Sequence, residues 1–546
     1  MTVTLEDIVL ARGSQILVDG FSTVFAGTDR VGVFGPNGCG KTSLLGAILG
    51  DLPLESGRVI RSPQEQLIGY LPQLRDLPAD WTVLRALRER TGVEAAERRL
   101  QESSARLSSD SSSGASVEYE SALSEFISLG ADSLDDRAAA VVADVGLGIS
   151  LDRHCEGLSG GEVARVGLAG LLLSQYDVLL LDEPTNDLDE NGLRILTQFL
   201  SDYRGLVILV SHDRHFLQTA IDVVVEFDPH LDRVTRFEGG YDAWQVERQR
   251  AHSAALEANR SYDETVAELK DEAAAIKRKS ARGVRTAKRS YAQGSVDKLL
   301  RDRMIDGATA GAGSARAVNR QLDKLEKPDS VRKVWNLRLS FPTDQRSPAS
   351  FTLSNAHLSR GGFSLGPLDL SVNPGERVRI HGTNGSGKSV LVEALAGAAT
   401  LEHPRAAGAS HATIGVLDQG RTQVPRAETT LSEWFPEASA LSSADARTLL
   451  AKFGLGSDDV DRPMRTLSEG ERTRVGLALI ASRETTGLIL DEPTNHLDLP
   501  AIEELEQALA NYTGTLIVVS HDEAFAQALH IDRTVVLGAN PSLGAS

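Results

Sequence analysis

The 546-residue sequence has few cysteines, no long apolar run and no overall basic charge. Two cysteines, Cys39 and Cys155, are too few for a disulfide framework or a cysteine-rich zinc site. No apolar run approaches the roughly 20 residues that a membrane-spanning helix needs. The first ten residues contain Glu6 and Asp7 and lack the basic segment of a secretory signal. We therefore expect a cytoplasmic protein with no membrane domain and no zinc.

The formal net charge of -19 limits how this chain can bind nucleic acid. A surface that is acidic overall repels polyanions, so any contact with RNA or DNA should be local. The length exceeds that of a single hydrophobic core, which predicts two or more domains. With 41% apolar and 24% charged residues, the composition is that of globular domains.

A glycine-rich segment, residues 35–42, lies between a strand expected at residues 30–34 and a helix expected from Ser43. Its order, Gly-Pro-Asn-Gly-Cys-Gly-Lys-Thr, is that of a phosphate-binding loop. The glycines let backbone N–H groups surround phosphate oxygens, Lys41 would reach the β- and γ-phosphates, and the Thr42 hydroxyl would bind magnesium. The predicted nucleotide-binding residues here are Gly35, Asn37, Gly38, Gly40, Lys41, Thr42 and Ser43.

Two successive carboxylates follow the apolar strand expected at residues 177–181. We expect Asp182 to hold Mg²⁺, directly or through water, and Glu183 to polarise the water that attacks ATP. The strand expected at residues 206–210 is followed by His212, which can sense the γ-phosphate. A single histidine at a strand end is more often structural, but its place in this series favours a catalytic role.

Two further segments complete the set in the first half. Gln73 follows the strand that begins at Ile68, and it is either an ordinary surface glutamine or a contact to magnesium and water. Ser159, Gly160 and Gly161 open a helix, in which the serine is a good N-cap and the glycines expose N–H groups. Taken alone, this segment is equally a plain capped helix or a phosphate contact.

All of these segments recur in the same order in the second half of the chain. The second set predicts a catalytic pair, Glu492 and His521, and the magnesium ligands Ser389, Gln419 and Asp491. The other binding residues are Gly382, Asn384, Gly385, Gly387, Lys388, Ser468 and Gly470, with Glu469 in place of one glycine. Because both halves keep the carboxylate and the histidine, we expect two active ATP sites.

The order of phosphate loop, glutamine, Ser-Gly-Gly signature, paired carboxylates and histidine resembles the ATP-binding cassette family. The resemblance implies an α/β fold with two tandem ATP-binding cassette domains that pair head to tail. Each signature would then complete the opposite site. One site would join Lys41, Thr42, Gln73, Asp182, Glu183 and His212 to Ser468 and Gly470, and the other would join Lys388, Ser389, Gln419, Asp491, Glu492 and His521 to Ser159 and Gly161.

One feature departs from the family pattern. The family stacks adenine on an aromatic side chain just before the strand that leads to the phosphate loop. No aromatic residue stands at residues 10–14 or near residues 359–361. Arg12 could stack through its guanidinium plane instead. The sequence therefore defines triphosphate binding better than a preference for ATP over GTP.

The domain boundaries follow from the two motif sets. We expect a first cassette at residues 1–242, a linker at 243–330 and a second cassette at 331–546. The first cassette carries extra residues at about 91–128, where helical stretches at 91–107 and 117–127 flank a serine-rich turn. This insertion is either a functional helical arm or an idle surface addition.

The linker combines a long helical stretch with a basic segment. Residues 243–282 contain no glycine and no proline, which predicts a helix of about 60 Å. The expected tip is 283–314 with a short helix at 295–305, and a return helix at 315–327 ends at Pro328. Between residues 277 and 303, ten basic residues oppose two acidic ones, a local charge of +8: Lys277, Arg278, Lys279, Arg282, Arg285, Lys288, Arg289, Lys298, Arg301 and Arg303. These side chains would neutralise RNA phosphates, although an isolated charged hairpin is usually only solvated.

Two cassettes, the repeated Asp-Glu-Pro-Thr-Asn segment and a charged helical linker resemble the ABC-F subfamily. This resemblance implies a monomeric ATPase, with ATP and Mg²⁺ as cofactors, that binds the ribosome and contacts rRNA and tRNA. It implies ATP-driven closure of the cassettes, which would insert the α-helical hairpin linker near the peptidyl transferase centre and confer resistance to a ribosome-targeting antibiotic. The alternatives are a housekeeping translation factor, the ATPase subunit of a drug exporter or importer, and a DNA-repair cassette protein.

Overall fold

The chain is described by a computed structural model. It covers residues 1–13, 15–64, 66–72, 77–109, 112–186, 188–228, 233–293, 295, 297–300, 302–303, 305–306, 318, 320–322, 325, 339–343, 348–360, 363–397, 413–538 and 543–545. Two compact units are present. One unit contains Met1–Asp242 (the first domain) together with Trp335–Ser546 (the second domain), and the other is Ala243–Val334.

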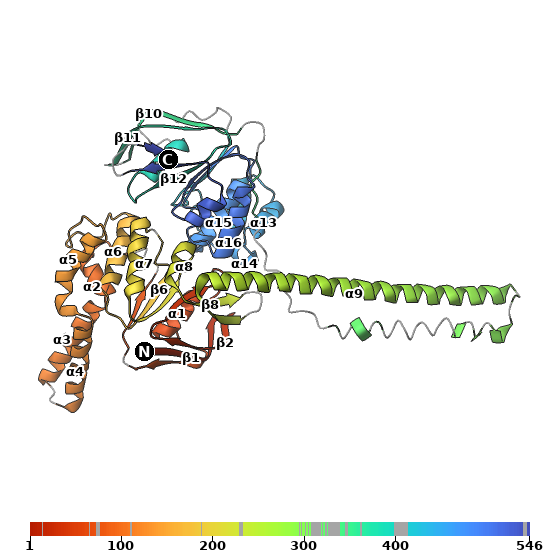
Figure 1. Cartoon of the computed structure of the whole chain (residues 1–546), viewed down its shortest axis with the longest axis horizontal. Coiled ribbons are helices and arrows are strands. Elements are labelled where there is room, and N and C mark those ends of the chain that lie inside the picture. Colours follow the sequence, from red (N-terminus) through yellow and green to blue (C-terminus); the bar gives the residue numbers. More distant parts are fainter. Residues whose placement is uncertain are drawn as a thin grey trace. The chain divides into compact units, whose positions relative to one another are not determined.

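The first domain contains two sheets (Figure 1). The six-stranded sheet has the order β5-β6-β7-β3-β8-β9, and all its pairs are parallel except β8 with β9. Its strands are β3 (Arg30–Phe34), β5 (Ile68–Leu71), β6 (Val178–Asp182), β7 (Leu206–Val210), β8 (Val223–Asp228) and β9 (Arg233–Glu238). The antiparallel sheet β2-β1-β4 consists of β1 (Thr2–Arg12), β2 (Gln15–Ala26) and β4 (Ser56–Ser62).

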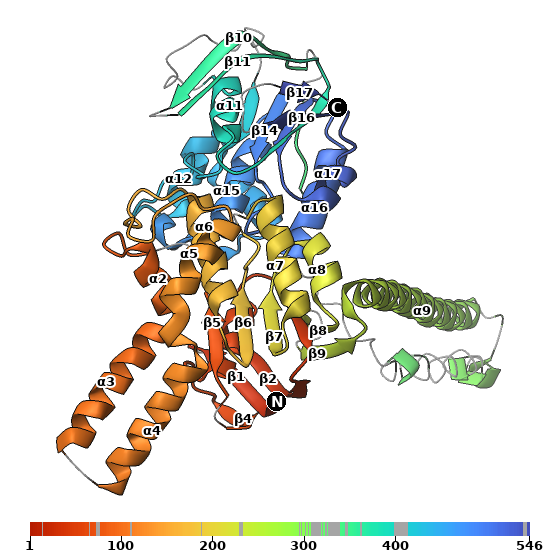
Figure 2. The same ribbon diagram turned by 60° about the vertical axis from the view of Figure 1, so that its left-hand side comes forward.

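The helices of the first domain connect these strands. They are α1 (Lys41–Leu49), α2 (Val83–Arg90), α3 (Val93–Ser109), α4 (Ser113–Ser128), the 3₁₀ turn η1 (Ala131–Ser133), α5 (Leu134–Asp144), α6 (Gly160–Leu173), α7 (Glu190–Asp202) and α8 (Arg214–Ala220). The helices α3 and α4 form an antiparallel pair (Figure 2), joined by ion pairs from Arg99 to Glu125 and from Arg106 to Glu118. This pair occupies the segment for which the sequence predicts a helical arm.

The second domain repeats the same plan. Its six-stranded sheet has the order β13-β14-β15-β12-β16-β17, again parallel except for the last pair. Its strands are β12 (Arg377–Gly382), β13 (Ile414–Leu417), β14 (Gly487–Asp491), β15 (Thr515–Val519), β16 (Arg533–Leu537) and β17 (Leu543–Ala545). A separate antiparallel sheet consists of β10 (Phe351–Arg360) and β11 (Phe363–Val372). The helices are α11 (Lys388–Leu395), α12 (Leu431–Ser439), α13 (Ser443–Lys452), α14 (Ser457–Val460), the 3₁₀ turn η2 (Met464–Thr466), α15 (Glu469–Ala481), α16 (Leu499–Ala510) and α17 (Glu523–Ala528).

Buried parallel strands place the predicted site residues at one edge of each sheet. Every residue of β6, β7, β14 and β15 is buried, as expected for strands covered on both faces. Ligands of open α/β sheets bind at the carboxyl ends of such strands. In the first sheet the carboxylate that ends β6 therefore lies at the same edge as the loop after β3, and in the second sheet the carboxylate that ends β14 lies at the same edge as the loop after β12. This arrangement confirms the expected α/β fold of two repeated domains.

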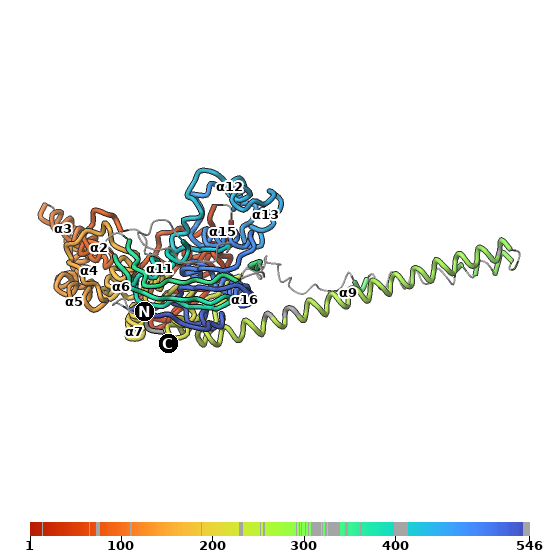
Figure 3. Tube along the Cα trace, turned by 90° about the horizontal axis from the view of Figure 1, so that it is seen from above, coloured from red at the N-terminus to blue at the C-terminus, as the bar shows by residue number. Residues whose placement is uncertain are grey.

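The second unit is dominated by one helix, α9 (Gly240–Ala292), which is continuous along its length (Figure 3). It extends past the predicted end at residue 282 and includes Gly283. An interior glycine costs about 1 kcal/mol relative to alanine, which a helix of 53 residues absorbs. Residues 283–292 of the expected tip are therefore helical.

Little of the remaining linker lies within the described residues. Residues 298–300, 302–303 and 305–306 are helical, and the Asp297 carboxylate accepts a hydrogen bond from the Leu300 N–H at 2.7 Å. Arg301 and most of the predicted return helix at 315–327 lie outside the part that the structure describes. Among the described helices, none is long and apolar enough to cross a membrane.

Candidate active sites

The loop between β3 and α1 has the conformation that a phosphate loop requires. Gly35, Gly38 and Gly40 have positive φ angles of 150°, 80° and 112°. The Lys41 ammonium donates to the carbonyl oxygens of Gly35 at 2.7 Å and Pro36 at 3.0 Å, so its side chain curls back over the loop. No side chain caps α1, which leaves the N–H groups of its first turn directed at the loop. A ring of such N–H groups at a helix N-terminus is an anion site.

The loop between β12 and α11 repeats this geometry. Gly385 and Gly387 have positive φ angles, and Lys388 donates to the carbonyl oxygens of Gly382 at 2.7 Å and Thr383 at 3.2 Å. A side chain at Gly382 would meet the Leu537 carbonyl at 2.6 Å, so only glycine fits there. The second domain thus offers an equivalent cradle for phosphate.

A hydroxyl and a carboxylate lie together at the first site. The Thr42 Oγ1 donates to Asp182 Oδ2 at 2.8 Å. Burial raises the pKa of Asp182, while the hydrogen bonds from Thr42 and Tyr70 oppose that rise. These oxygens are hard donors of the kind that Mg²⁺ takes beside substrate phosphates, so they fit that ion. Within the described residues no cluster of three or more His, Cys, Asp or Glu could hold a metal by itself.

Glu183 and His212 face each other at the same site. Their side chains are each 12% exposed, and His212 Nε2 lies 3.1 Å from Glu183 Oε1. Burial raises the pKa of Glu183 to about 8, and burial followed by the Lys41 cation lowers the pKa of His212. A raised carboxyl pKa makes the ionised group a stronger proton acceptor, which suits a general base.

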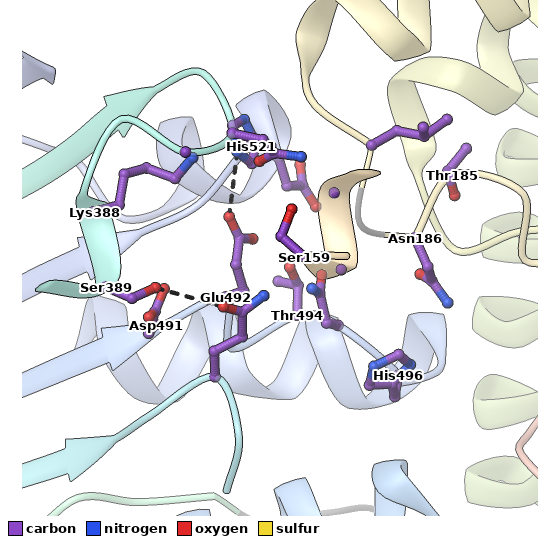
Figure 4. Close-up of a pocket in the computed structure, with 18 of the residues that line it drawn as sticks. Ser159, Thr185, Asn186, Lys388, Ser389, Asp491, Glu492, Thr494, His496 and His521 are labelled. Carbon is purple, nitrogen blue, oxygen red and sulfur yellow. Dashed lines mark hydrogen bonds and ion pairs between the residues drawn. The ribbon is translucent and has the colours of Figure 1, made fainter. Parts of the chain in front are cut away.

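The second site contains the same groups with looser contacts (Figure 4). His521 Nε2 lies 3.6 Å from Glu492 Oε1, and Ser389 Oγ lies 3.5 Å from Gln419 Oε1. Burial raises the pKa of Asp491 to about 6, although a hydrogen bond from Ser389 opposes it. Burial, with the Lys388 cation second, lowers the pKa of His521 to about 3.

Each phosphate loop contacts the opposite domain. The Asn37 N–H donates to Asp498 Oδ2 at 2.9 Å, and its side-chain amide donates to the His496 carbonyl at 3.0 Å. A Cβ atom at Gly470 would lie 3.1 Å from the Asn37 amide, so the signature of the second domain adjoins the first phosphate loop. In the reciprocal contact, a Cβ at Gly161 would lie 2.8 Å from the Asn384 amide.

A cavity of about 380 Å³ at the second site is lined by residues of both domains. Lys388, Glu492 and His521 line it from the second domain (Figure 4). Ser159 and Gly161 line it from the first domain. The structure therefore brings together the residues that the sequence assigns to this composite site, whereas Gln73 of the first site lies outside the described residues.

One pocket residue was missed by the sequence analysis. Phe363 lines the cavity, and its ring atoms would be 2.8 Å from a Cβ at Gly387. No aromatic was expected near residues 359–361, but the β10–β11 hairpin pairs Arg360 with Phe363 and so brings the ring back to the phosphate loop. In the first domain Arg12 pairs with Gln15 instead. The register of the hairpin, and not the position of Phe363 along the sequence, places its ring at the phosphate loop.

Comparisons with known proteins agree with this geometry. The ABC transporter family matches residues 18–186 and 365–495, the parts of both domains that hold the phosphate loops and carboxylates. The ATP-binding protein YdiF of Bacillus subtilis is 29% identical over 534 residues, which cover 96% of this chain and 78% of the relative. The tylosin resistance ATP-binding protein TlrC of Streptomyces fradiae is 31% identical over 539 residues, 95% of this chain and 94% of the relative.

Solved structures support the same fold. The ribosome-bound archaeal Pelota and ABCE1 assembly contains a chain that matches 99% of this protein and 78% of its own length, with a TM-score of 0.58 and 19% identity. The RNase-L inhibitor matches 97% of this protein and 87% of its own length, with a TM-score of 0.55 and 19% identity. The repeated cassette fold and the matched ATP-binding relatives establish an ATPase. The chain belongs to the ATP-binding cassette family and is of the ABC-F type, with two cassettes in one polypeptide.

Proposed function

We propose that the protein binds ribosomes and uses ATP-driven pairing of its cassettes to act on them through the linker, conferring resistance to a ribosome-targeting antibiotic. The observation that carries this proposal is the exposed basic surface at the end of α9. ATP hydrolysis supplies the release step.

Hydrolysis would use equivalent residues at both sites. Glu183 and Glu492 would accept a proton from the attacking water, and His212 and His521 would hold the γ-phosphate. Lys41 and Lys388 would neutralise the phosphates. Thr42 with Asp182, and Ser389 with Asp491, would hold Mg²⁺, which would neutralise charge on the transferred phosphate. Ser159 and Ser468 would complete the opposite sites through the N–H groups that they help to orient.

Contacts between the cassettes would convert ATP binding into closure. Asn37 already contacts His496 and Asp498, and Asn384 lies beside Gly161 and Asp189. A nucleotide between these groups would bind both domains at once, so its free energy would favour the paired arrangement. After hydrolysis that advantage would be lost, and the pair would open.

The linker carries the chemistry for RNA. Seven basic residues at 277–289 of α9 are exposed, no acidic residue stands among them, and they form no ion pair with residues that the structure describes: Lys277, Arg278, Lys279, Arg282, Arg285, Lys288 and Arg289. Lys298 and Arg303 are exposed as well. Exposed cations along one rod suit a polyphosphate backbone. The similarity to TlrC supports resistance as the outcome, because the name of that relative states tylosin resistance.

A hydrolysis-deficient chain tests ribosome binding. We expect Glu183→Gln with Glu492→Gln to stop turnover while ATP still pairs the cassettes. The doubly substituted protein should co-sediment with ribosomes in ATP and dissociate in ADP. Free migration in ATP would contradict the proposal.

Drug susceptibility tests resistance separately from ribosome binding. The wild-type protein is expressed in a sensitive bacterium, and growth is measured against macrolides, lincosamides and streptogramins. An increased inhibitory concentration for at least one class is expected. Ribosome binding without any such increase would instead indicate a housekeeping translation factor.

Charge removal tests the linker itself. Replacing the seven exposed basic residues of α9 with glutamine should weaken ribosome binding and flatten its dependence on salt. As a matched control, Glu257, Asp263, Glu264, Glu268, Asp271 and Glu272 of the same helix are replaced by their amides. Equal loss of binding in both variants would show that the basic segment has no specific role.

A further inference from the structure

Arg421 is a buried arginine beside the second site to which the sequence motifs assign no role. It stands in the loop after β13, two residues beyond Gln419, and is 3% exposed. Its φ angle is +51°, a conformation that residues other than glycine rarely adopt. Such conformations persist only where surrounding contacts impose them, and they occur often at functional sites.

The Arg421 guanidinium holds the main chain of both acidic residues. Nη1 donates to the Asp491 carbonyl oxygen at 3.1 Å, and Nη2 donates to the Glu492 carbonyl oxygen at 2.9 Å. Nε donates to Thr473 Oγ1 on α15 at 3.1 Å, and Nη1 also donates to the Asp418 carbonyl oxygen. One side chain therefore ties the end of β14 to the glutamine loop and to the signature helix.

Glu492 has a main chain that hydrogen bonds hold on both sides. Its φ angle is +45°, and its N–H donates to the Val519 carbonyl oxygen at 2.9 Å. The carbonyl on its other side accepts from Arg421 and, at 3.4 Å, from the Asn495 N–H. Because the peptide groups before and after Glu492 are both held, the direction in which its side chain leaves the main chain is fixed.

We propose that Arg421 is a positioning residue for the second site, which fixes the Glu492 backbone and thereby aims its carboxylate at the attacking water. The inference rests on the proposed role of Glu492 as the base. It is drawn for the second site, where Thr473 accepts from Arg421 Nε, whereas the first domain has Ala164 at that position. Arg75, at the position equivalent to Arg421, lies outside the described residues.

The test measures ATP turnover for Arg421→Ala and Arg421→Lys in a Glu183→Gln chain, where turnover depends on Glu492. If the Glu183→Gln chain is inactive, the two sites hydrolyse ATP only together. The Arg421 substitutions are then made in the wild-type chain, where they should lower turnover in the same way. A displaced base should lower kcat on the order of 10²-fold. The KM for ATP should change by less than about threefold, because the phosphate loop is intact. Lysine should restore part of kcat, since it keeps the charge but cannot reach both carbonyls.

Arg447→Ala is the matched control, because Arg447 is an exposed arginine of the same domain that pairs with Asp461 at 3.1 Å. Its kcat should match that of the parent chain. Unchanged kcat in Arg421→Ala would overturn the inference. So would a fall in kcat accompanied by loss of ATP binding and a lower unfolding temperature than Arg447→Ala, since that pattern indicates a purely structural arginine.

Glu492→Gln in the same background separates this inference from the proposed function. Turnover that persists there would remove the base role of Glu492, and the role of Arg421 with it. Turnover that is lost there but retained in Arg421→Ala would overturn only the role of Arg421.

Discussion

The two nucleotide sites share their chemistry but differ in their surroundings. At the first, the histidine lies 3.1 Å from the carboxylate, and at the second it lies 3.6 Å away. The second site has Phe363 where the first domain has Gln15, and His381 where the first has Phe34. The His381 ring lies 5.5 Å from that of His521. A repeated motif set can thus retain the reacting groups while the residues around them differ.

The largest effect should come from removing the catalytic carboxylates. Glu183→Gln and Glu492→Gln should each remove turnover at one site, and together they should lower kcat by about 10²- to 10⁴-fold, the usual contribution of a general base. Phosphate release at saturating ATP measures this. A single variant as inactive as the double one would show that the sites do not turn over independently.

We expect adenine to stack on Phe363 at the second site, and the lack of an aromatic ring at Gln15 should appear as a difference in nucleotide affinity. Phe363→Ala should weaken ATP binding at the second site by about 1–3 kcal/mol, the usual cost of losing a stacked base. Gln15→Ala should change affinity far less, and Gln15→Phe should tighten the first site. Equilibrium titration with a fluorescent ATP analogue measures both sites. Equal effects of Phe363→Ala and Gln15→Ala would contradict the asymmetry.

A smaller effect should come from the ion pair between the domains. Arg214 Nη1 lies 3.0 Å from Glu506 Oε1, and both side chains are largely buried. The second domain has Glu523 at the position equivalent to Arg214, and the first domain has Thr197 at the position equivalent to Glu506. Glu523 pairs with Arg379 of its own domain, so this ion pair is not repeated. Arg214→Ala should destabilise domain pairing by about 1.5–3 kcal/mol, because a charged hydrogen bond is lost.

A charge exchange provides the control for that pair. Arg214→Glu alone should destabilise domain pairing, and adding Glu506→Arg should restore it. Energy transfer between dyes on the two cassettes gives the measurement. If the exchanged pair is as destabilised as the single variant, the contact contributes no pairing energy.

The smallest effect should come from the helical arm. Arg106 pairs with Glu118 at 2.8 Å, but both side chains are about half exposed. Exposed ion pairs contribute about 0.2–1 kcal/mol, so Arg106→Ala should barely change thermal unfolding. A large decrease in unfolding temperature would show that α3 and α4 carry more of the stability of the first domain than their exposure indicates.

The sequence predicted the repeated sheets and the carboxylates because those features are local. A phosphate loop between a strand and a helix, or Asp182 at the end of an apolar strand, is visible within ten or so residues. The predicted end of α9 at residue 282 is too early, because the helix-forming residues around Gly283 offset the cost of one glycine.

The missed residues depend on contacts between distant segments. Phe363 reaches the phosphate loop only through hairpin register, and Arg421 reaches Asp491 and Glu492 across 70 residues or more. Arg214 meets Glu506 only because the two domains pair. No periodicity or spacing in the chain encodes such contacts, so motif analysis finds the reacting groups and not the side chains that position them.

Both sites should bind ATP, but with unequal affinity. The most direct measurement is a binding isotherm of ATP on the Glu183→Gln, Glu492→Gln chain, with and without Phe363→Ala. We expect two ATP molecules per chain, with the tighter site weakened by Phe363→Ala. One ATP per chain, or two equal sites that Phe363→Ala leaves unchanged, would contradict it.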